Sequence, residues 1–208
     1  MGIKRSVTLI DAILAKEEGQ ESNILPEFIK MIGFEANAKV LSGNSSKQDF
    51  MEALLNGDSR FLHLSCHGDK DGFYFNGQRG THVGIRDLEN HIRLKIQKPS
   101  PLRGRFLTVS ACGDPKVEFW ENLHEITGIS CVIAPMGKVD FDESSFFYTS
   151  FYFALLRHRY SCNRRDTSER IIDYVDTFQK AKSAYLALGG YGAFRLCFWW
   201  DGMMKEII

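Results

Sequence analysis

The sequence predicts an α/β domain of three layers, in which a mainly parallel sheet lies between two layers of helices. Three observations lead to this fold class. Short apolar runs alternate with longer amphipathic segments along the chain. The short runs are almost continuous in apolar residues, which is typical of strands covered on both faces. No linker of the usual composition divides the 208 residues, so we expect one domain over residues 1–208.

The first elements alternate between strand and helix. Residues 6–11 and 36–41 have the apolar content of strands. Between them, apolar residues at helical spacing predict a helix over 21–32, which Gly33 ends as a C-cap glycine. A further helix follows a capping serine and runs to residue 55. The chain thus crosses from strand to strand by helices, as parallel sheets require.

The middle of the chain contains two strongly apolar strands. The first covers residues 61–65, with sequence FLHLS, and the second covers residues 105–110, which end in FLTVS. Between them, residues 72–77 predict a small hairpin because they end in Asn-Gly. Residues 85–92 predict a short helix or turn. Their nearly continuous apolar residues are typical of strands in a sheet covered on both faces.

The last part of the chain repeats the alternation. Amphipathic segments predict helices over 117–126, 142–159 and 167–188, the last ended by a pair of glycines. Apolar runs predict strands over 129–134 and 193–199. These elements complete a sheet with helices on both faces.

Composition and charge exclude several classes of function. Lys and Arg together number 26, as do Asp and Glu, so no basic excess favours nucleic acid or an anionic membrane. No segment approaches the ~18 consecutive apolar residues of a membrane-spanning helix. The five cysteines are odd in number and none are spaced as CxxC, which predicts reduced thiols and a cytoplasmic protein.

Two of the predicted strands end in residues with catalytic chemistry. In the run FLHLSCHG the last residue but one is His67, and in the run FLTVSACG it is Cys112. Ligands gather at the carboxyl ends of the strands of an open parallel sheet. If the two strands are neighbours, an imidazole lies near a thiol there, and a histidine within reach activates a cysteine as a nucleophile.

A glycine follows each of these two residues. Gly68 would let the backbone turn sharply after His67, and Gly113 would permit a tight turn behind Cys112. The N–H groups of Gly68 and Cys112 are then the candidates for an oxyanion hole.

These two motifs resemble those of a known family. LSCHG (64–68) and TVSACGD (108–114) are similar to the histidine and cysteine motifs of caspase-like peptidases, and most of all to the bacterial CHAT branch. The segment CVIAPMGKVDFDESSFFYTSFYFALL (131–156) resembles the strand and helix that follow the CHAT cysteine, although Ala134-Pro135-Met136 lacks the family's tryptophan. The resemblance covers about residues 5–200.

The resemblance implies a caspase-like fold and a cysteine endopeptidase. His67 would be the general base and Cys112 the nucleophile. An acidic residue after the next strand, Asp142 first and Asp140 second, would bind a basic P1 side chain. Such enzymes are regulated proteases that cleave few proteins, and bacterial relatives act in antiviral defence or cell death. The implied partners are a protein substrate, with a gasdermin as one candidate, and an activating protein.

The residues themselves leave other interpretations open. Cys66 should face away from His67 as a small buried hydrophobe, and His63 should lie in the core. The same alternation of neighbouring side chains argues against a metal site, so we expect no metal and no other cofactor. Asp142 could cap the helix that begins there. A catalytically silent binding module of the same fold, or another thiol-dependent amide hydrolase, remains an alternative to the peptidase.

Overall fold

A computed structural model describes residues 6–13, 21–41, 44–56, 59–75, 81–97, 100–111, 113, 115–157 and 167–208. The strands in these residues form two sheets, a large central sheet and a small one. The strands are β1 (Ser6–Asp11), β2 (Glu35–Val40), β3 (Phe61–Ser65), β4 (His67–Asp69), β5 (Gly72–Phe75), β6 (Thr81–Gly84), β7 (Phe106–Ser110), β8 (Cys131–Pro135), β9 (Phe194–Trp200) and β10 (Met203–Ile207).

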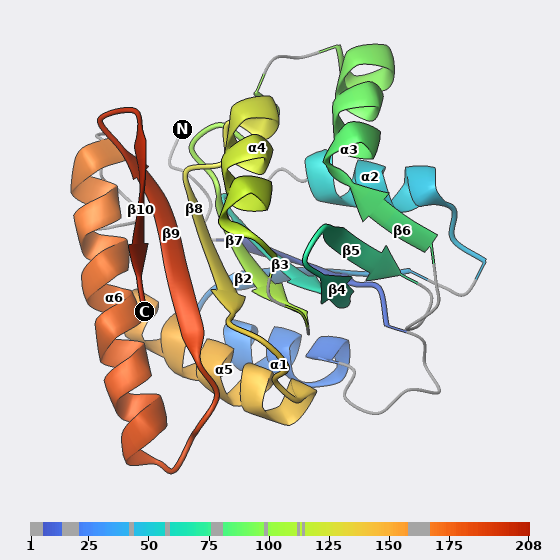
Figure 1. The fold of residues 1–208 in the computed structure, drawn as a ribbon. Coiled ribbons are helices and arrows are strands. Elements are labelled where there is room, and N and C mark those ends of the chain that lie inside the picture. The colour runs from blue at the N-terminus through green and yellow to red at the C-terminus, as the bar shows by residue number, and fades with distance from the viewer. Residues whose placement is uncertain are drawn as a thin grey trace.

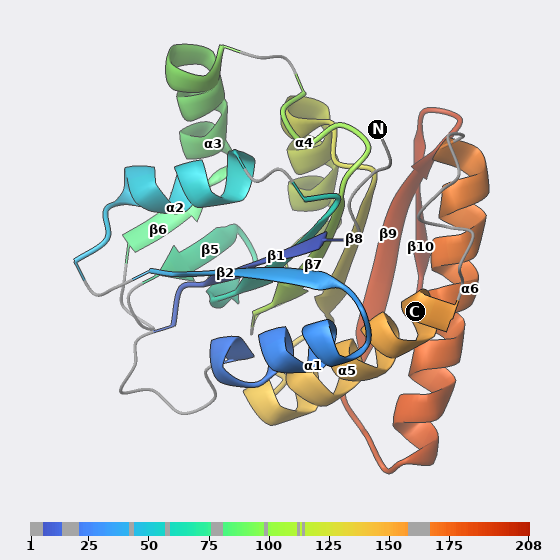
Figure 2. The same ribbon diagram turned by 180° about the vertical axis from the view of Figure 1, so that it is seen from behind.

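The helices connect these strands and cover the central sheet on both faces. They are α1 (Leu25–Met31), α2 (Lys47–Leu55), α3 (Ile85–His91), α4 (Val117–Thr127), α5 (Phe141–Arg157) and α6 (Thr167–Ala187), with a 3-10 turn at Glu21–Asn23 and a π-helical turn at Ile92–Ile96. Figures 1 and 2 show α1 and α5 on one side of the sheet and α2, α3 and α4 on the other. The molecule is thus a mixed α/β fold with helices flanking a sheet, as the sequence predicts.

The central sheet is mostly parallel among the described strands. Its order is β10-β9-β8-β7-β3-β1-β2, and the five strands from β2 to β8 in this order run parallel to one another. Only β9 and β10 are antiparallel to their neighbours. Strands β3 and β7, the two apolar strands that end in the candidate motifs, are adjacent in the middle of the sheet.

Local sequence explains where several elements begin and end. Ser46 caps α2 by accepting a hydrogen bond from the Asp49 N–H at 3.2 Å, and the Asp49 carboxylate accepts one from the Ser46 N–H at 2.7 Å. Gly33 follows α1 with a φ of +92°, the left-handed conformation predicted for a C-cap glycine. These caps fix the first two crossovers.

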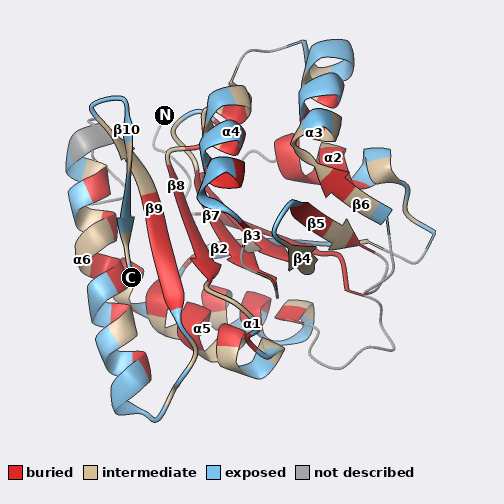
Figure 3. Cartoon of the chain, in the orientation of Figure 1, coloured by how far each residue is buried: buried red, intermediate tan, exposed pale blue. Residues whose placement is uncertain are grey.

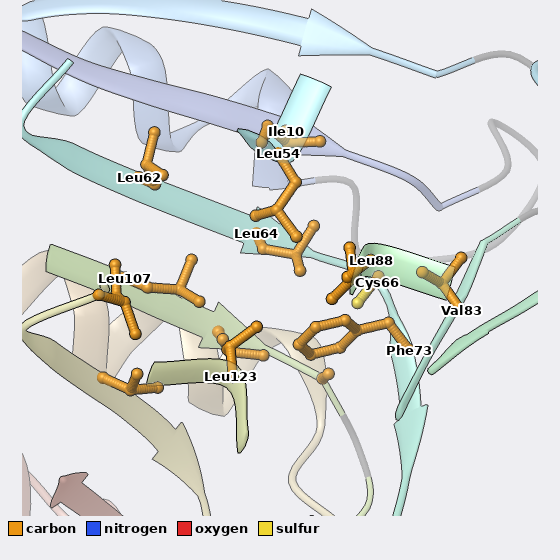
Figure 4. Close-up of a cluster of buried hydrophobic side chains, with 14 of the residues drawn as sticks. Ile10, Leu54, Leu62, Leu64, Cys66, Phe73, Val83, Leu88, Leu107 and Leu123 are labelled. Carbon is orange, nitrogen blue, oxygen red and sulfur yellow. The ribbon is translucent and has the colours of Figure 1, made fainter. Parts of the chain in front are cut away.

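Each face of the sheet has its own apolar core. On the α2, α3 and α4 side, the core includes Leu62, Leu64 and Cys66 of the β3 segment, which pack with residues such as Leu107 (Figure 4). On the α1, α5 and α6 side, the core is rich in aromatic rings, among them the stacked pair of Phe147 and Phe194. Figure 3 shows that the buried residues concentrate on the strands and on the helix faces turned towards them.

The structure differs from the sequence prediction at two places. Strand β10 was not predicted, because only some of its side chains are half-buried and its apolar pattern is weak. The chain does not stop after Cys66 but continues into β4, which pairs with β5 in a separate small sheet. The predicted hairpin turn at Asn76-Gly77 lies outside the described residues, although β5 and β6 on either side of it do pair as antiparallel strands.

No helix among the described residues has the length and apolarity needed to cross a bilayer.

Candidate functional site

The two candidate motifs follow neighbouring strands that end at the same level. Strands β3 and β7 pair in parallel, and their last paired residues are Ser65 and Ser110. The pairing continues one residue beyond β3, because the Cys66 N–H donates to the Ser110 carbonyl oxygen at 3.0 Å. His67 therefore leaves the sheet beside the point where the FLTVSACG segment leaves it.

Cys112 lies outside the described residues, but the residues on either side of it are described. Ala111 is buried, and Gly113 has a φ of +102°, a conformation that favours glycine. A Cβ atom at Gly113 would lie 2.7 Å from the Asp69 Cα and closer still to the Gly68 carbonyl oxygen. Gly113 therefore adopts a conformation that suits the predicted tight turn, and it lies directly on the backbone that follows His67.

Two further backbone contacts hold the same segment. The Gly113 N–H donates to the Gly137 carbonyl oxygen at 3.3 Å, in the loop between β8 and α5. The Lys116 N–H donates to the Lys70 carbonyl oxygen at 3.2 Å. The segment after Cys112 is thereby fixed between the His67 segment and the loop that precedes α5.

His67 is half-buried at the start of β4. Its ring meets the Phe141 ring edge-on, with centroids 5.9 Å apart. Gly68 does not make the sharp turn expected of it: it lies in β4 opposite Phe73, in extended backbone. Pairing with β5 is the physical reason, since an antiparallel partner holds the chain straight. The oxyanion role of Gly68 and Cys112 remains a prediction.

The two candidate acidic residues flank the ring that contacts His67. Asp140 and Asp142 are both exposed, and Phe141 between them is the first residue of α5. The position that caps this helix therefore belongs to Asp140, whose carbonyl oxygen accepts from the Ser144 N–H at 2.9 Å. Asp142 lies in the first turn instead, with one oxygen 2.9 Å from the Glu143 N–H.

Behind the His67 segment, a chain of polar side chains is buried on the α1 and α5 face of the sheet. Its centre is His63 of β3, which has no exposed surface. His63 Nε2 lies 2.9 Å from Glu21 Oε2, and His63 Nδ1 lies 2.8 Å from Thr108 Oγ1. Tyr152 OH continues the chain at 2.8 Å from Thr108 Oγ1, and Ser145 Oγ donates to Glu21 Oε1 at 2.8 Å. Such a chain polarises its members and fixes their positions.

The donors and acceptors of this network can be matched in a consistent order. If His63 Nε2 donates to the Glu21 carboxyl group, Nδ1 accepts from the Thr108 hydroxyl, which in turn accepts from Tyr152. Burial raises the pKa of Tyr152 well above its ordinary value, despite its hydrogen bond with Thr108, so the phenol keeps its proton.

Between this network and the strand ends lies a row of serines. Ser110 Oγ donates to Ser144 Oγ of α5 at 2.9 Å, and both residues are buried. Ser65, beside Ser110 in the register, is also buried, and its hydroxyl has no hydrogen-bond partner among the described residues. Polar side chains thus run along this face of β3 and β7 from the core to the site.

The three cysteines that the structure describes do not suit nucleophilic chemistry. Cys66 lies in the apolar core near Leu88 and Phe73 (Figure 4), as predicted for a buried hydrophobe. Burial raises the pKa of Cys197 to about 12, and it raises the pKa of Cys131 further. Because the thiolate is the reactive species, these thiols are inert at neutral pH.

A hollow of about 600 Å³ adjoins the site between the small sheet and α4. Lys70, Asp71 and Lys116 line it near the contact between the two motif segments, and Glu118 and Arg86 line it further out. Within the described part of the chain, no group of three His, Cys, Asp or Glu residues is placed to hold a metal ion.

Comparison with protein-family models and with curated proteins gives no match to this chain. The resemblance of the two motifs to caspase-like peptidases therefore stays a prediction from sequence. Any function of the site must therefore be argued from the positions and chemistry of its own residues.

The sequence prediction missed the buried network. It assigned His63 to the core correctly but gave no role to Glu21, Ser144 or Ser145. One signal was present: the strands read Phe-x-His-x-Ser and Phe-x-Thr-x-Ser, so polar residues recur at matching positions on one face. Two adjacent strands with this pattern must bury polar side chains together, which requires partners from another element.

Proposed function

We propose that the protein is a cysteine endopeptidase with a caspase-like fold, in which His67 is the general base and Cys112 the nucleophile. One observation carries the proposal: Gly113, the residue after Cys112, packs directly on the backbone of Gly68 and Asp69. With β3 and β7 adjacent and in register, this contact favours a short distance between the His67 ring and the Cys112 thiol.

The reaction follows from these two side chains. His67 accepts the thiol proton, and the sulfur of Cys112 bonds to the carbonyl carbon of the scissile peptide. The negative oxygen would be held by N–H groups at Gly68 and Cys112. The tetrahedral intermediate expels the amine, to which His67 returns the proton, and a thioester remains. Water, deprotonated by His67, then releases the carboxylic acid and the free thiol.

The acidic residues around Phe141 suit a specificity role. Asp140 and Asp142 are exposed on either side of the ring that contacts His67. A carboxylate at this place would bind an Arg or Lys side chain at P1 by a charge-assisted hydrogen bond. The proposed substrate is a partner protein with a basic residue at the cleavage site, and a bacterial gasdermin or another defence protein is one candidate.

The nucleophile is tested with a peptide probe that carries an electrophilic ketone and Arg, Lys, Leu or Asp at P1. We expect labelling at Cys112, located by mass spectrometry of the digested protein. Cys112→Ala and His67→Ala should lower labelling and peptide cleavage by roughly a thousandfold or more. Cys66→Ala is the matched control, since the Cys66 thiol lies in the apolar core. Cleavage that survives Cys112→Ala would remove the nucleophile from the proposal.

The specificity residues are tested on the same panel. Asp142→Ala should lower kcat/KM for peptides with Arg or Lys at P1 and leave those with Leu unchanged. Asp140→Ala, which removes the carboxylate on the other side of Phe141, is the comparison variant. An equal loss for every P1 residue would assign Asp142 to the stability of α5 instead.

A further inference from the structure

The wall of the site opposite the small sheet is the beginning of α5. Phe141, the first residue of this helix, places its ring against the ring of His67. The loop just before it receives the hydrogen bond from the Gly113 N–H at Gly137. The position of this helix start therefore sets the space around His67.

Side-chain bonds hold the first turn of α5 on the sheet from behind. Ser144 Oγ accepts from Ser110 Oγ at 2.9 Å, and Ser145 Oγ donates to Glu21 Oε1 at 2.8 Å. Glu21 is distant from Ser145 in the sequence and precedes it by 124 residues. Its other oxygen is fixed by His63 at 2.9 Å.

Glu21 is an unusual residue to bury so completely. Only 2% of its surface is exposed, although a buried carboxyl group costs much free energy unless its partners compensate. Here both oxygens have a partner, and the two partners belong to different elements, β3 and α5. The carboxyl group thus joins β3, the strand just before His67, to the helix that presents Phe141.

We propose that Glu21 is a positioning residue of the site: through Ser145 it holds the start of α5, and with it Phe141, against His67. For catalysis this inference rests on the proposed peptidase. The geometric part, the coupling of Ser145 to the His67 ring, stands without it.

The test compares two serines of the same helix. Ser145→Ala removes the bond to Glu21, whereas Ser150→Ala removes only a bond to the Phe146 carbonyl oxygen within α5. Both hydroxyls are half-buried, so the two variants are matched in chemistry and exposure. Ser145→Ala should lower kcat roughly tenfold with little change in KM, because a small displacement of a catalytic group costs rate more than binding. Ser150→Ala should leave both unchanged, and Ser145→Thr should restore most of kcat.

A second readout needs no activity. The ring current of Phe141 displaces the NMR resonances of the His67 ring hydrogens, which can be assigned by their loss in His67→Gln. Ser145→Ala should move these resonances, and Ser150→Ala should not. Glu21→Gln keeps an oxygen for Ser145 and should move them less than Ser145→Ala does.

The outcomes separate the two proposals. His67 resonances that stay in place in Ser145→Ala, together with an unchanged kcat, would overturn the positioning role. If Cys112→Ala still cleaves peptides, the proposed Cys112 nucleophile fails, and the His67 resonances alone decide whether Glu21 acts through α5. Equal effects of Ser145→Ala and Ser150→Ala on both readouts would reduce Ser145 to a general contribution to helix stability and also overturn the inference.

Discussion

Two clusters near the strand ends combine a carboxyl group, a histidine and a hydroxyl, and they differ in their contact with water. In the buried cluster, His63 Nε2 lies 2.9 Å from Glu21, with 0% and 1% of the two side chains exposed. In the outer cluster, His82 Nε2 lies 3.8 Å from Asp69, with 37% and 40% exposed, and Tyr74 OH donates to Asp69 at 2.7 Å.

The difference shows that solvent, more than residue type, decides what such a cluster can do. Water screens the outer cluster, where the carboxylate mainly holds a turn by accepting from the Asp71 and Gly72 N–H groups. In the buried cluster no water can replace a lost partner, so each group depends on the others. Only the buried cluster can therefore fix the relative position of two elements.

The largest effect is expected at the buried carboxyl group. Glu21→Ala should lower the free energy of unfolding by about 3–5 kcal/mol, because His63 and Ser145 lose their partner in a site without water. Glu27→Ala is the control: Glu27 is exposed and pairs with Lys30 on the surface of α1, so we expect a loss below about 0.5 kcal/mol. Urea unfolding followed by circular dichroism measures both.

Similar losses for Glu21→Ala and Glu27→Ala would contradict the distinction between the two environments. Glu21→Gln separates charge from hydrogen bonding, since it keeps the shape and one acceptor. A stability of Glu21→Gln close to that of the unchanged protein would mean that hydrogen bonding, not charge, holds the cluster.

The far end of the buried network should show a smaller effect. Tyr152→Phe removes one phenolic hydroxyl and leaves Thr108 with fewer partners, at a cost of about 1–2 kcal/mol. The matched control is Tyr191→Phe, at a tyrosine that is 78% exposed. No loss in Tyr152→Phe would show that the network ends at Thr108.

The sequence predicts the fold better than it predicts this network, and the reason is the range of the interactions involved. Strands 61–65 and 105–110 carry their own signal, since consecutive apolar residues demand burial wherever the chain goes. Their adjacency and parallel direction agree with the structure. The partners of His63, in contrast, come from a residue 42 positions earlier and from helix α5, and no local pattern announces them.

The site was predictable in outline for a similar reason. That His67 and Cys112 both follow apolar strands can be seen in the sequence, and a glycine at position 113 permits the positive φ that the structure shows. The extended backbone at Gly68 was not, because pairing with Phe73 depends on a strand that approaches from outside the motif. A glycine permits a turn but does not require one.

The outer cluster should respond to pH with a known direction. Partial burial raises the pKa of Asp69, but hydrogen bonds from Tyr74 and from the Asp71 N–H outweigh this and hold the pKa below its ordinary value of 3.8. The stabilisation is therefore full above pH 3.8 and is lost as the pH falls through the lower pKa of the folded state.

Tyr74→Phe removes one of these bonds. At pH 7 we expect a Tm lower by about 1–2 °C, and we expect the difference from the unchanged protein to shrink as the pH falls below 3.8. Thermal unfolding of both proteins measures this difference at pH values between about 2 and 7 at which both proteins are still folded. A difference that stays constant across this range would show that the Tyr74 ring contributes by packing and not through Asp69.

The smallest effect is expected for the outer histidine. His82→Gln removes a long, exposed contact to Asp69, and we expect a change in Tm below about 1 °C at low salt. Because the Debye length falls to about 3 Å at 1 M salt, added NaCl should abolish even this change. The effect of Glu21→Ala should survive the same salt concentration, since ions do not enter the buried cluster. If the Tm of His82→Gln stayed lower at 1 M NaCl, the outer cluster would be as insensitive to salt as the buried cluster of Glu21 and His63. That result would contradict the distinction drawn from their exposure.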